Sequence, residues 1–113
     1  MNEPILLTLE SVADIEKIEN KIHCIPGIEV KNKNTQKGIN GIDNLMYLLS
    51  IGGGVVIVEL SNLIKNLISK NNCKKVKIDD IEITGFSTDE TIDLLKEIIA
   101  LKNKEKQNKS EGE

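Results

Sequence analysis

The segment Leu45–Ile68 (LMYLLSIGGGVVIVELSNLIKNLI) constrains the fold of this chain more than any other. Up to Val58 it is apolar on every side of a helical projection, which is typical of an element that is buried all around. Three consecutive glycines, Gly52, Gly53 and Gly54, lie in its middle. Because glycine is unfavourable inside a helix, the triplet indicates close packing of another backbone or a local break. The segment therefore predicts a long, glycine-containing central helix in the core of a small domain.

The composition indicates one small domain whose core consists of aliphatic side chains. The chain has 113 residues, aromatic residues make up 2% of it, and arginine is absent. Bidentate recognition of phosphates and guanine relies on arginine, and base stacking relies on aromatic rings. Together with a net charge of −3, this composition disfavours nucleic-acid binding. The two cysteines fit a reducing compartment, and the first residues do not resemble a signal peptide, so we expect a cytoplasmic protein.

Shorter elements are expected before the central segment. The apolar run Ile5–Leu9 predicts a buried strand. A helix is expected to begin at Ser11, which would form a capping box with Asp14. Alternating apolar and charged residues at 28–30 indicate a short, half-exposed strand. The polar segment Lys31–Asn44 predicts a loop that leads into the central helix.

A β-hairpin is expected after the central helix, over Lys75–Thr84. With Asp79 and Asp80 as its two-residue turn, the apolar residues of both arms fall on one face. The same register places Lys77 opposite Glu82, which is a favourable pair of charges. The hairpin therefore contributes two neighbouring strands to a sheet.

The last ordered element is expected to be an amphipathic helix that begins with a capping box formed by Ser87 and Glu90. Residues 102–113 are rich in charge and predict a disordered tail after a single domain at 3–101. The expected order is β-α-β-α-β-β-α. This order predicts an α+β fold with two layers, in which three helices pack on one mixed four-stranded sheet.

The residues that could carry chemistry do not form a recognisable set. A phosphate-binding loop needs Lys followed by Ser or Thr after its last glycine, whereas Val55 follows here. A zinc site needs about four ligands, and Cys73 with Asp79 or Asp80 would complete a site at His23 and Cys24 only by chance. We therefore expect no catalytic residue, cofactor or metal, and a structural role for the glycine triplet.

The apolar segment that begins at Leu45 is too short to span a membrane. The uninterrupted run Leu45–Val58 covers about 14 residues and ends at Glu59, whereas a spanning helix needs about 20. We expect no membrane insertion. The alternative hypothesis is a membrane-active or oligomer-forming protein that uses Leu45–Val58.

Five segments of the sequence follow one another in the order found in a known protein family. They are a strand and helix (ILLTLESVADIEKIENKI), a strand (GIEV), an apolar helix with glycines (LMYLLSIGGGVVIVELSNLIKNLI), a hairpin (KVKIDDIEITG) and an acidic-capped helix (STDETIDLLKEII). From Ile5 to about Leu101 the chain resembles the effector-associated constant component family of bacterial conflict systems. Its members are encoded beside, or fused to, peptidases and other effector or signalling domains. The lack of arginine and the Asp79-Asp80 turn depart from the pattern of many members.

The resemblance implies a non-enzymatic adaptor in a bacterial defence system, including antiviral defence. The expected partner is an effector or sensor encoded nearby, such as a peptidase, and homo-oligomerisation is left open. Binding residues concentrate on loops held by a rigid scaffold, and charged helix faces are also exposed. The candidate protein-binding residues are Lys33, Lys37 and Asn40 in the expected loop, and Asp89, Asp93 and Glu97 on the last helix.

Overall fold

The computed structural model describes residues 4–38 and 41–111, and their side chains up to residue 102. This part of the chain forms five strands and three helices around one core. The elements are β1 (Ile5–Ser11), α1 (Ile15–His23), β2 (Ile28–Gln36), β3 (Asp43–Ile51), α2 (Gly54–Ser69), β4 (Cys73–Ile78), β5 (Ile81–Glu82) and α3 (Thr88–Glu111). The strands form one sheet in the order β2-β3-β1-β4-β5, and each neighbouring pair is antiparallel.

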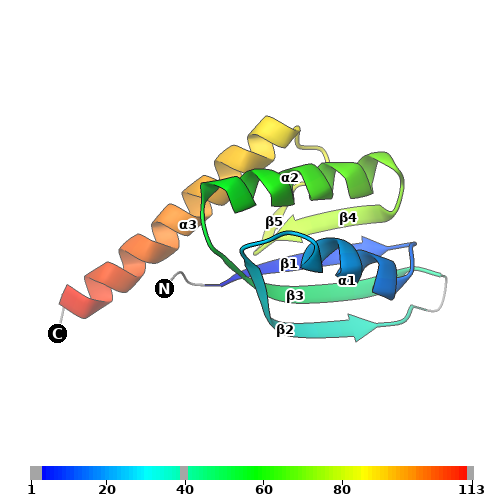
Figure 1. Cartoon of the computed structure of the whole chain (residues 1–113), viewed down its shortest axis with the longest axis horizontal. Coiled ribbons are helices and arrows are strands. Elements are labelled where there is room, and N and C mark those ends of the chain that lie inside the picture. Colours follow the sequence, from blue (N-terminus) through cyan, green and yellow to red (C-terminus); the bar gives the residue numbers. More distant parts are fainter. Residues whose placement is uncertain (1–3, 39–40, 112–113) are drawn as a thin grey trace.

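The first six elements contain two interleaved β-α-β units. The strands joined by α1, β1 and β2, lie on either side of β3, and the strands joined by α2, β3 and β4, lie on either side of β1. This is the split β-α-β arrangement of the ferredoxin-like architecture. In Figure 1, α1 and α2 lie over the sheet, while β2 runs along its lower edge. The helix α3 packs against α2 and extends away from the sheet towards its C-terminal end (Figure 1).

The core lies between the sheet and the helices. Along β1, buried side chains alternate with half-buried ones, because successive residues of a strand point to opposite faces. The same alternation along β3 buries Leu45, Tyr47, Leu49 and Ile51. The core-facing residues of α2 complete this layer: Val56, Ile57, Leu60, Ile64 and Leu67.

The prediction of one helix over Leu45–Ile68 is wrong. Residues up to Ile51 form β3, and α2 begins only at Gly54. Strand β3 lies between β2 and β1, so its backbone groups pair on both sides and its inner face is buried. The glycines therefore lie where the strand ends and the helix begins, and not inside a helix.

The polar segment after residue 30 is also different from the prediction. Strand β2 runs from Ile28 to Gln36, so it includes most of the first half of the expected loop. The sheet has five strands in place of four, because β3 forms where the central helix was predicted, and its described pairs are antiparallel rather than mixed. The α+β class and the three helices are confirmed in the described part of the chain.

The predicted hairpin is confirmed. Lys77 lies opposite Glu82 and Ile78 opposite Ile81, as the Asp79-Asp80 turn requires. The backbone of Asp79 has φ 53°, in the left-handed region that two-residue turns use. The hairpin carries a diagonal ion pair in which Lys75 Nζ lies 3.6 Å from Glu82 Oε1.

Of the two expected capping boxes, only the second forms. The backbone N–H of Glu90 donates to Ser87 Oγ and the N–H of Ser87 donates to Glu90 Oε1, both at 3.1 Å. Ser11 instead ends β1, where its buried Oγ accepts a hydrogen bond from the N–H of Ala13 at 3.1 Å. The first helix begins at Ile15, and the side chain of its N-cap residue, Asp14, makes no capping hydrogen bond.

The helix α3 continues to Glu111, so residues 102–111 are helical where the composition predicts a disordered tail. Lys102 attaches this helix to the sheet. Its Nζ donates to the carbonyl oxygen of Pro4 at 2.8 Å and lies 3.2 Å from Asp79 Oδ2. The middle of α3 is therefore connected both to Pro4, just before β1, and to the hairpin turn.

Candidate functional site

The outer edge of β2 is the candidate binding surface. This strand forms one edge of the sheet, and within residues 4–38 and 41–111 only β3 pairs with it. Every residue from Lys31 to Lys37 is exposed. A terminal strand presents a row of backbone donors and acceptors that another extended chain can pair with. Figure 1 shows that the helices leave this edge open.

Three lysines give this edge a basic character. Lys31 Nζ lies 3.1 Å from Glu29 Oε1, and Lys33 Nζ lies 3.2 Å from Glu19 Oε1. Exposed pairs of this kind contribute at most about 1 kcal/mol, so both ammonium groups can exchange these partners for others. Lys37 forms no ion pair with the residues that the structure describes. The edge can therefore attract negatively charged groups.

A β-bulge lies within the same strand. The register with β3 shifts between Val30 and Asn32, and the N–H of Lys33 donates to Asn32 Oδ1 at 2.8 Å. Bulges and edge lysines are two features by which proteins prevent unspecific pairing of their terminal strands. Both features make unspecific pairing of this edge less favourable.

The structure brings together part of the first candidate set. Lys33 lies on β2 and Lys37 directly follows its last residue, so both belong to the same edge, while Asn40 lies outside the described residues. The second set, Asp89, Asp93 and Glu97, is exposed on α3. That helix packs on α2, away from β2, so the two sets belong to separate surfaces (Figure 1).

Only one glycine of the triplet lies close to another backbone. The N–H of Gly52 donates to the carbonyl oxygen of Gly27 at 3.0 Å, and a Cβ on Gly52 would lie 3.1 Å from that oxygen. A Cβ on Gly53 or Gly54 would meet nothing within 4 Å. The conformationally demanding glycine is Gly27, whose φ is 92° and whose Cβ would lie 2.5 Å from Val56 Cγ2. In the sequence, Gly27 follows Pro26 and indicates the end of a helix, but not this close contact with Val56.

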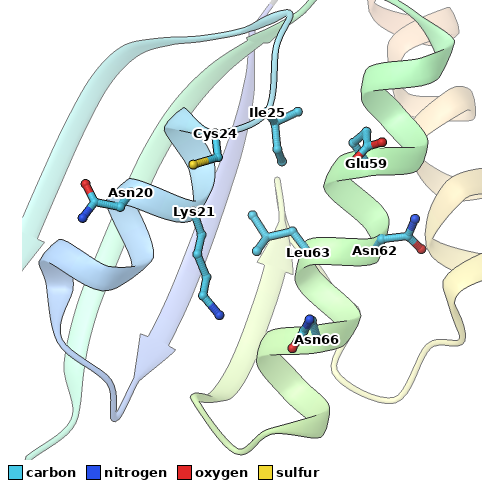
Figure 2. A pocket seen from close by; sticks show the side chains of 8 residues that line it. All are labelled: Asn20, Lys21, Cys24, Ile25, Glu59, Asn62, Leu63 and Asn66. Atoms are coloured by element: carbon cyan, nitrogen blue, oxygen red, sulfur yellow. The ribbon is translucent and has the colours of Figure 1, made fainter.

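A groove of about 440 Å³ lies between α1 and α2. Its lining residues are Asn20, Lys21, Cys24, Ile25, Glu59, Asn62, Leu63 and Asn66. Figure 2 shows Ile25 and Leu63 pointing into the gap, with Glu59 near one end and Asn66 near the other. Sequence reasoning missed this site, because it depends on the distance between two helices that are separated by two strands.

Two other hollows are less suited to binding. One, of about 380 Å³ beside the start of α1, is lined by Asp14, Ile15, Glu16, Glu19, Lys37 and Asp43. Within the described ranges, no group of three or more His, Cys, Asp or Glu residues could hold a metal ion. The other, lined by Thr8, Glu10, Asn44, Lys75 and Lys77, encloses about 100 Å³, below the roughly 300 Å³ of ordinary ligand sites.

Two buried titratable groups are held in their protonated forms. Burial, with a smaller contribution from the negative charge of Glu19, raises the pKa of Tyr47 above its ordinary range. The Tyr47 hydroxyl is buried without a hydrogen-bond partner among the described residues. Burial also raises the pKa of the Cys73 thiol to about 11, and a hydrogen bond with Ser11 opposes this shift. Neither group is therefore an activated nucleophile at neutral pH.

In the part of the chain that the structure describes, no helix is long and apolar enough to cross a membrane. The run Leu45–Val58 is divided between β3 and the start of α2.

The two cysteines are expected to differ strongly in reactivity. Cys24 is exposed, whereas Cys73 is 3% exposed and its raised pKa lowers its thiolate fraction about 100-fold near neutral pH. A thiol reagent should therefore modify one cysteine rapidly in the folded protein and both in urea. Cys24→Ser should remove the rapid reaction, and a rapid reaction that persists in this variant would contradict the buried position of Cys73.

The comparisons with known proteins leave the fold without an identified relative. No protein-family model, curated protein or solved structure matches the chain significantly. The resemblance to the effector-associated constant component family therefore stays a prediction.

Proposed function

We propose that this chain is a non-enzymatic adaptor that captures an acidic, extended segment of another protein along the outer edge of β2. The observation that carries this proposal is that a nine-residue strand terminates the sheet and is exposed over residues 31–36. A segment that adds to this edge gains backbone hydrogen bonds in register, and its side chains then provide specificity.

The charges on the edge favour an acidic partner over a second copy of the chain. Pairing two copies of β2 would bring Lys31, Lys33 and Lys37 of both chains close together, and like charges on paired strands are unfavourable. Aspartate or glutamate on the incoming strand would instead pair with them. The lysines thus disfavour pairing with a second copy of the chain and favour pairing with an acidic partner.

The identity of the partner follows from the resemblance. On that basis the partner is an effector or sensor of a bacterial conflict system, encoded near this chain, such as a peptidase, and the complex forms in the cytoplasm. A non-enzymatic role is also supported by Tyr47 and Cys73, whose raised pKa values keep them protonated. Together these points favour a protein that presents a surface over one that performs a reaction.

The alternative, oligomerisation through Leu45–Val58, has less support. Residues 45–51 belong to a strand that pairs on both sides. The large apolar residues of this run that remain exposed are Met46 on β3, at 38%, and Val55 and Val58 on α2, at 78% and 40%. Three such side chains cover far less than the roughly 1,000 Å² that a stable interface needs. We therefore prefer the β2 edge.

Neutralising the edge is expected to weaken partner capture about 10-fold, because three exposed charge pairs of about 0.5 kcal/mol each contribute roughly 1.5 kcal/mol together. The variant combines Lys31→Gln, Lys33→Gln and Lys37→Gln. Its matched control combines Lys65→Gln, Lys70→Gln and Lys96→Gln, which change the net charge equally at exposed sites on other elements.

The measurement is co-purification with the products of neighbouring genes, followed by titration of the captured protein. Both variants should keep the parent's stability to within about 0.5 kcal/mol per site, so a loss of binding would not reflect unfolding. Equal capture by the edge variant and the control would move the binding site away from β2. A parent that captures none of these products would contradict the adaptor function.

A further inference from the structure

We infer that the groove between α1 and α2 is a second protein-binding site, which takes a short extended segment with an apolar side chain between an acidic and a basic one. This inference does not depend on β2, because the groove lies on the helical layer. It would allow one small domain to hold two protein segments at once.

The floor of the groove is apolar. Ile25 is buried and Leu63 is half-buried, and their side chains approach each other across the gap in Figure 2. The volume of about 440 Å³ falls within the roughly 300–1,000 Å³ of ordinary ligand sites. A leucine-sized side chain placed between Ile25 and Leu63 would leave water and cover both.

The two ends of the groove carry opposite charges. Lys21 extends towards Asn66 at one end, while Glu59 lies near Ile25 at the other (Figure 2). Neither Lys21 nor Glu59 forms an ion pair with any residue the structure describes. An incoming carboxylate beside Lys21 and an incoming ammonium beside Glu59 would complement both ends. The amide of Asn66 can also donate to, and accept from, a peptide backbone.

The length of the groove limits the segment to about three residues. Glu59 and Asn66 are seven positions apart on α2, which at about 1.5 Å per residue corresponds to roughly 10 Å along the helix. An extended chain covers about 3.3 Å per residue, so three residues span the same distance. The central side chain then points to the apolar floor, and the long side chains of its neighbours, which leave the backbone on the other face, bend back to the two charges.

Titration of the ¹⁵N-labelled full chain with the blocked tripeptide acetyl-Glu-Leu-Lys-amide tests this inference. A groove of this size is expected to bind it with a Kd on the order of 1 mM, so shifts of the amide signals are a suitable readout. The shifts should cluster at residues 20–25 and 59–66. Replacing the peptide's leucine with serine should weaken binding at least about 10-fold, because the apolar contact is lost.

Two variants of the protein distinguish specific binding in the groove from unspecific binding of the peptide elsewhere on the surface. Lys21→Met and Glu59→Gln are each expected to weaken binding about 2- to 5-fold, as for exposed charge pairs. The matched controls, Lys17→Met and Glu97→Gln, change exposed charges outside the groove and should bind like the parent. The inference is overturned if no signal shifts at about 10 mM peptide, tenfold above the expected Kd. It is also overturned if the shifts lie on β2, or if the groove variants bind as well as the controls.

Discussion

Replacing Leu49 with alanine is expected to lower the free energy of unfolding by about 2–5 kcal/mol. Leu49 is 0% exposed on the inner face of β3, where it lies opposite Ile5 of β1 and Val30 of β2. Its removal leaves a cavity among side chains from three neighbouring strands. No other part of β3 can move in to fill that space, because the strand is paired on both edges.

The matched control is Met46→Ala, on the same strand but on its opposite face. Met46 is 38% exposed, so its truncation should cost less than about 1 kcal/mol. Urea unfolding of both variants measures the difference. Similar losses at Leu49 and Met46 would contradict the alternation of a strand and would favour an element that is buried all around.

Gly27→Ala is expected to cost about 2–4 kcal/mol, because it combines backbone strain with a steric overlap. Gly27 has φ 92°, which disfavours residues with a Cβ, and the added Cβ would lie 2.5 Å from Val56 Cγ2. Valine is stiff about χ1, so Val56 cannot easily turn away. The carbonyl oxygen of Gly27 also accepts a hydrogen bond from the N–H of Gly52, which connects the turn before β2 to the turn before α2.

Gly53→Ala is the control for this substitution. Its Cβ would meet nothing within 4 Å, and its φ of 165° is extended backbone that any residue adopts. Gly53 is the N-cap residue of α2, where glycine is preferred over alanine, so chemical unfolding should show a loss of at most about 1 kcal/mol. If Gly53→Ala destabilises the protein as much as Gly27→Ala, the triplet has a close-packing role that the structure does not show.

Local signals in the sequence predicted the elements that form from neighbouring residues. The hairpin at Asp79 and the capping box at Ser87 depend on residues within a few positions of each other. Turn chemistry and caps are specified at that range, so both predictions are confirmed. Ser11 is the exception, since its environment at the end of β1 includes the distant backbone of Asn72.

The prediction of a helix over Leu45–Ile51 is wrong because the apolar run does not show the two-residue period of a strand. Residues 45–49 are all apolar, although only alternate ones face the core. The outward-facing residues Met46 and Leu48 are apolar as well, so the strand lacks the alternation of apolar and polar residues that marks a half-exposed strand. A continuous run of this kind cannot be distinguished from a buried helix until its neighbours in the sheet are known.

Most of β2 was not predicted as a strand because this part of its sequence lacks apolar residues. Residues 31–36 are polar and exposed, so they carry no apolar alternation at all. Their strand is specified by pairing with β3, which is a long-range interaction. The prediction that Lys33 and Lys37 are exposed was therefore made for a loop, whereas the structure places both at a strand edge. The groove between α1 and α2 had no signal in the sequence.

The two proposed surfaces lie on different parts of the molecule. The β2 edge belongs to the end of the sheet, and the groove belongs to the helical layer above it. An adaptor benefits from this arrangement, because two segments can bind without competing. Linking them in one complex would raise the effective concentration of one partner near the other.

Hydrogen exchange of the backbone amides in the complex is the most direct test of binding along β2. The complex to use is that of the full chain with a product of a neighbouring gene. We expect slower exchange at residues 31–36 on binding, since strand addition pairs the outward-facing N–H groups of β2. Exchange along α3 near Asp89 and Asp93 should stay the same. Protection confined to α3, with β2 exchanging as in the free protein, would contradict the account.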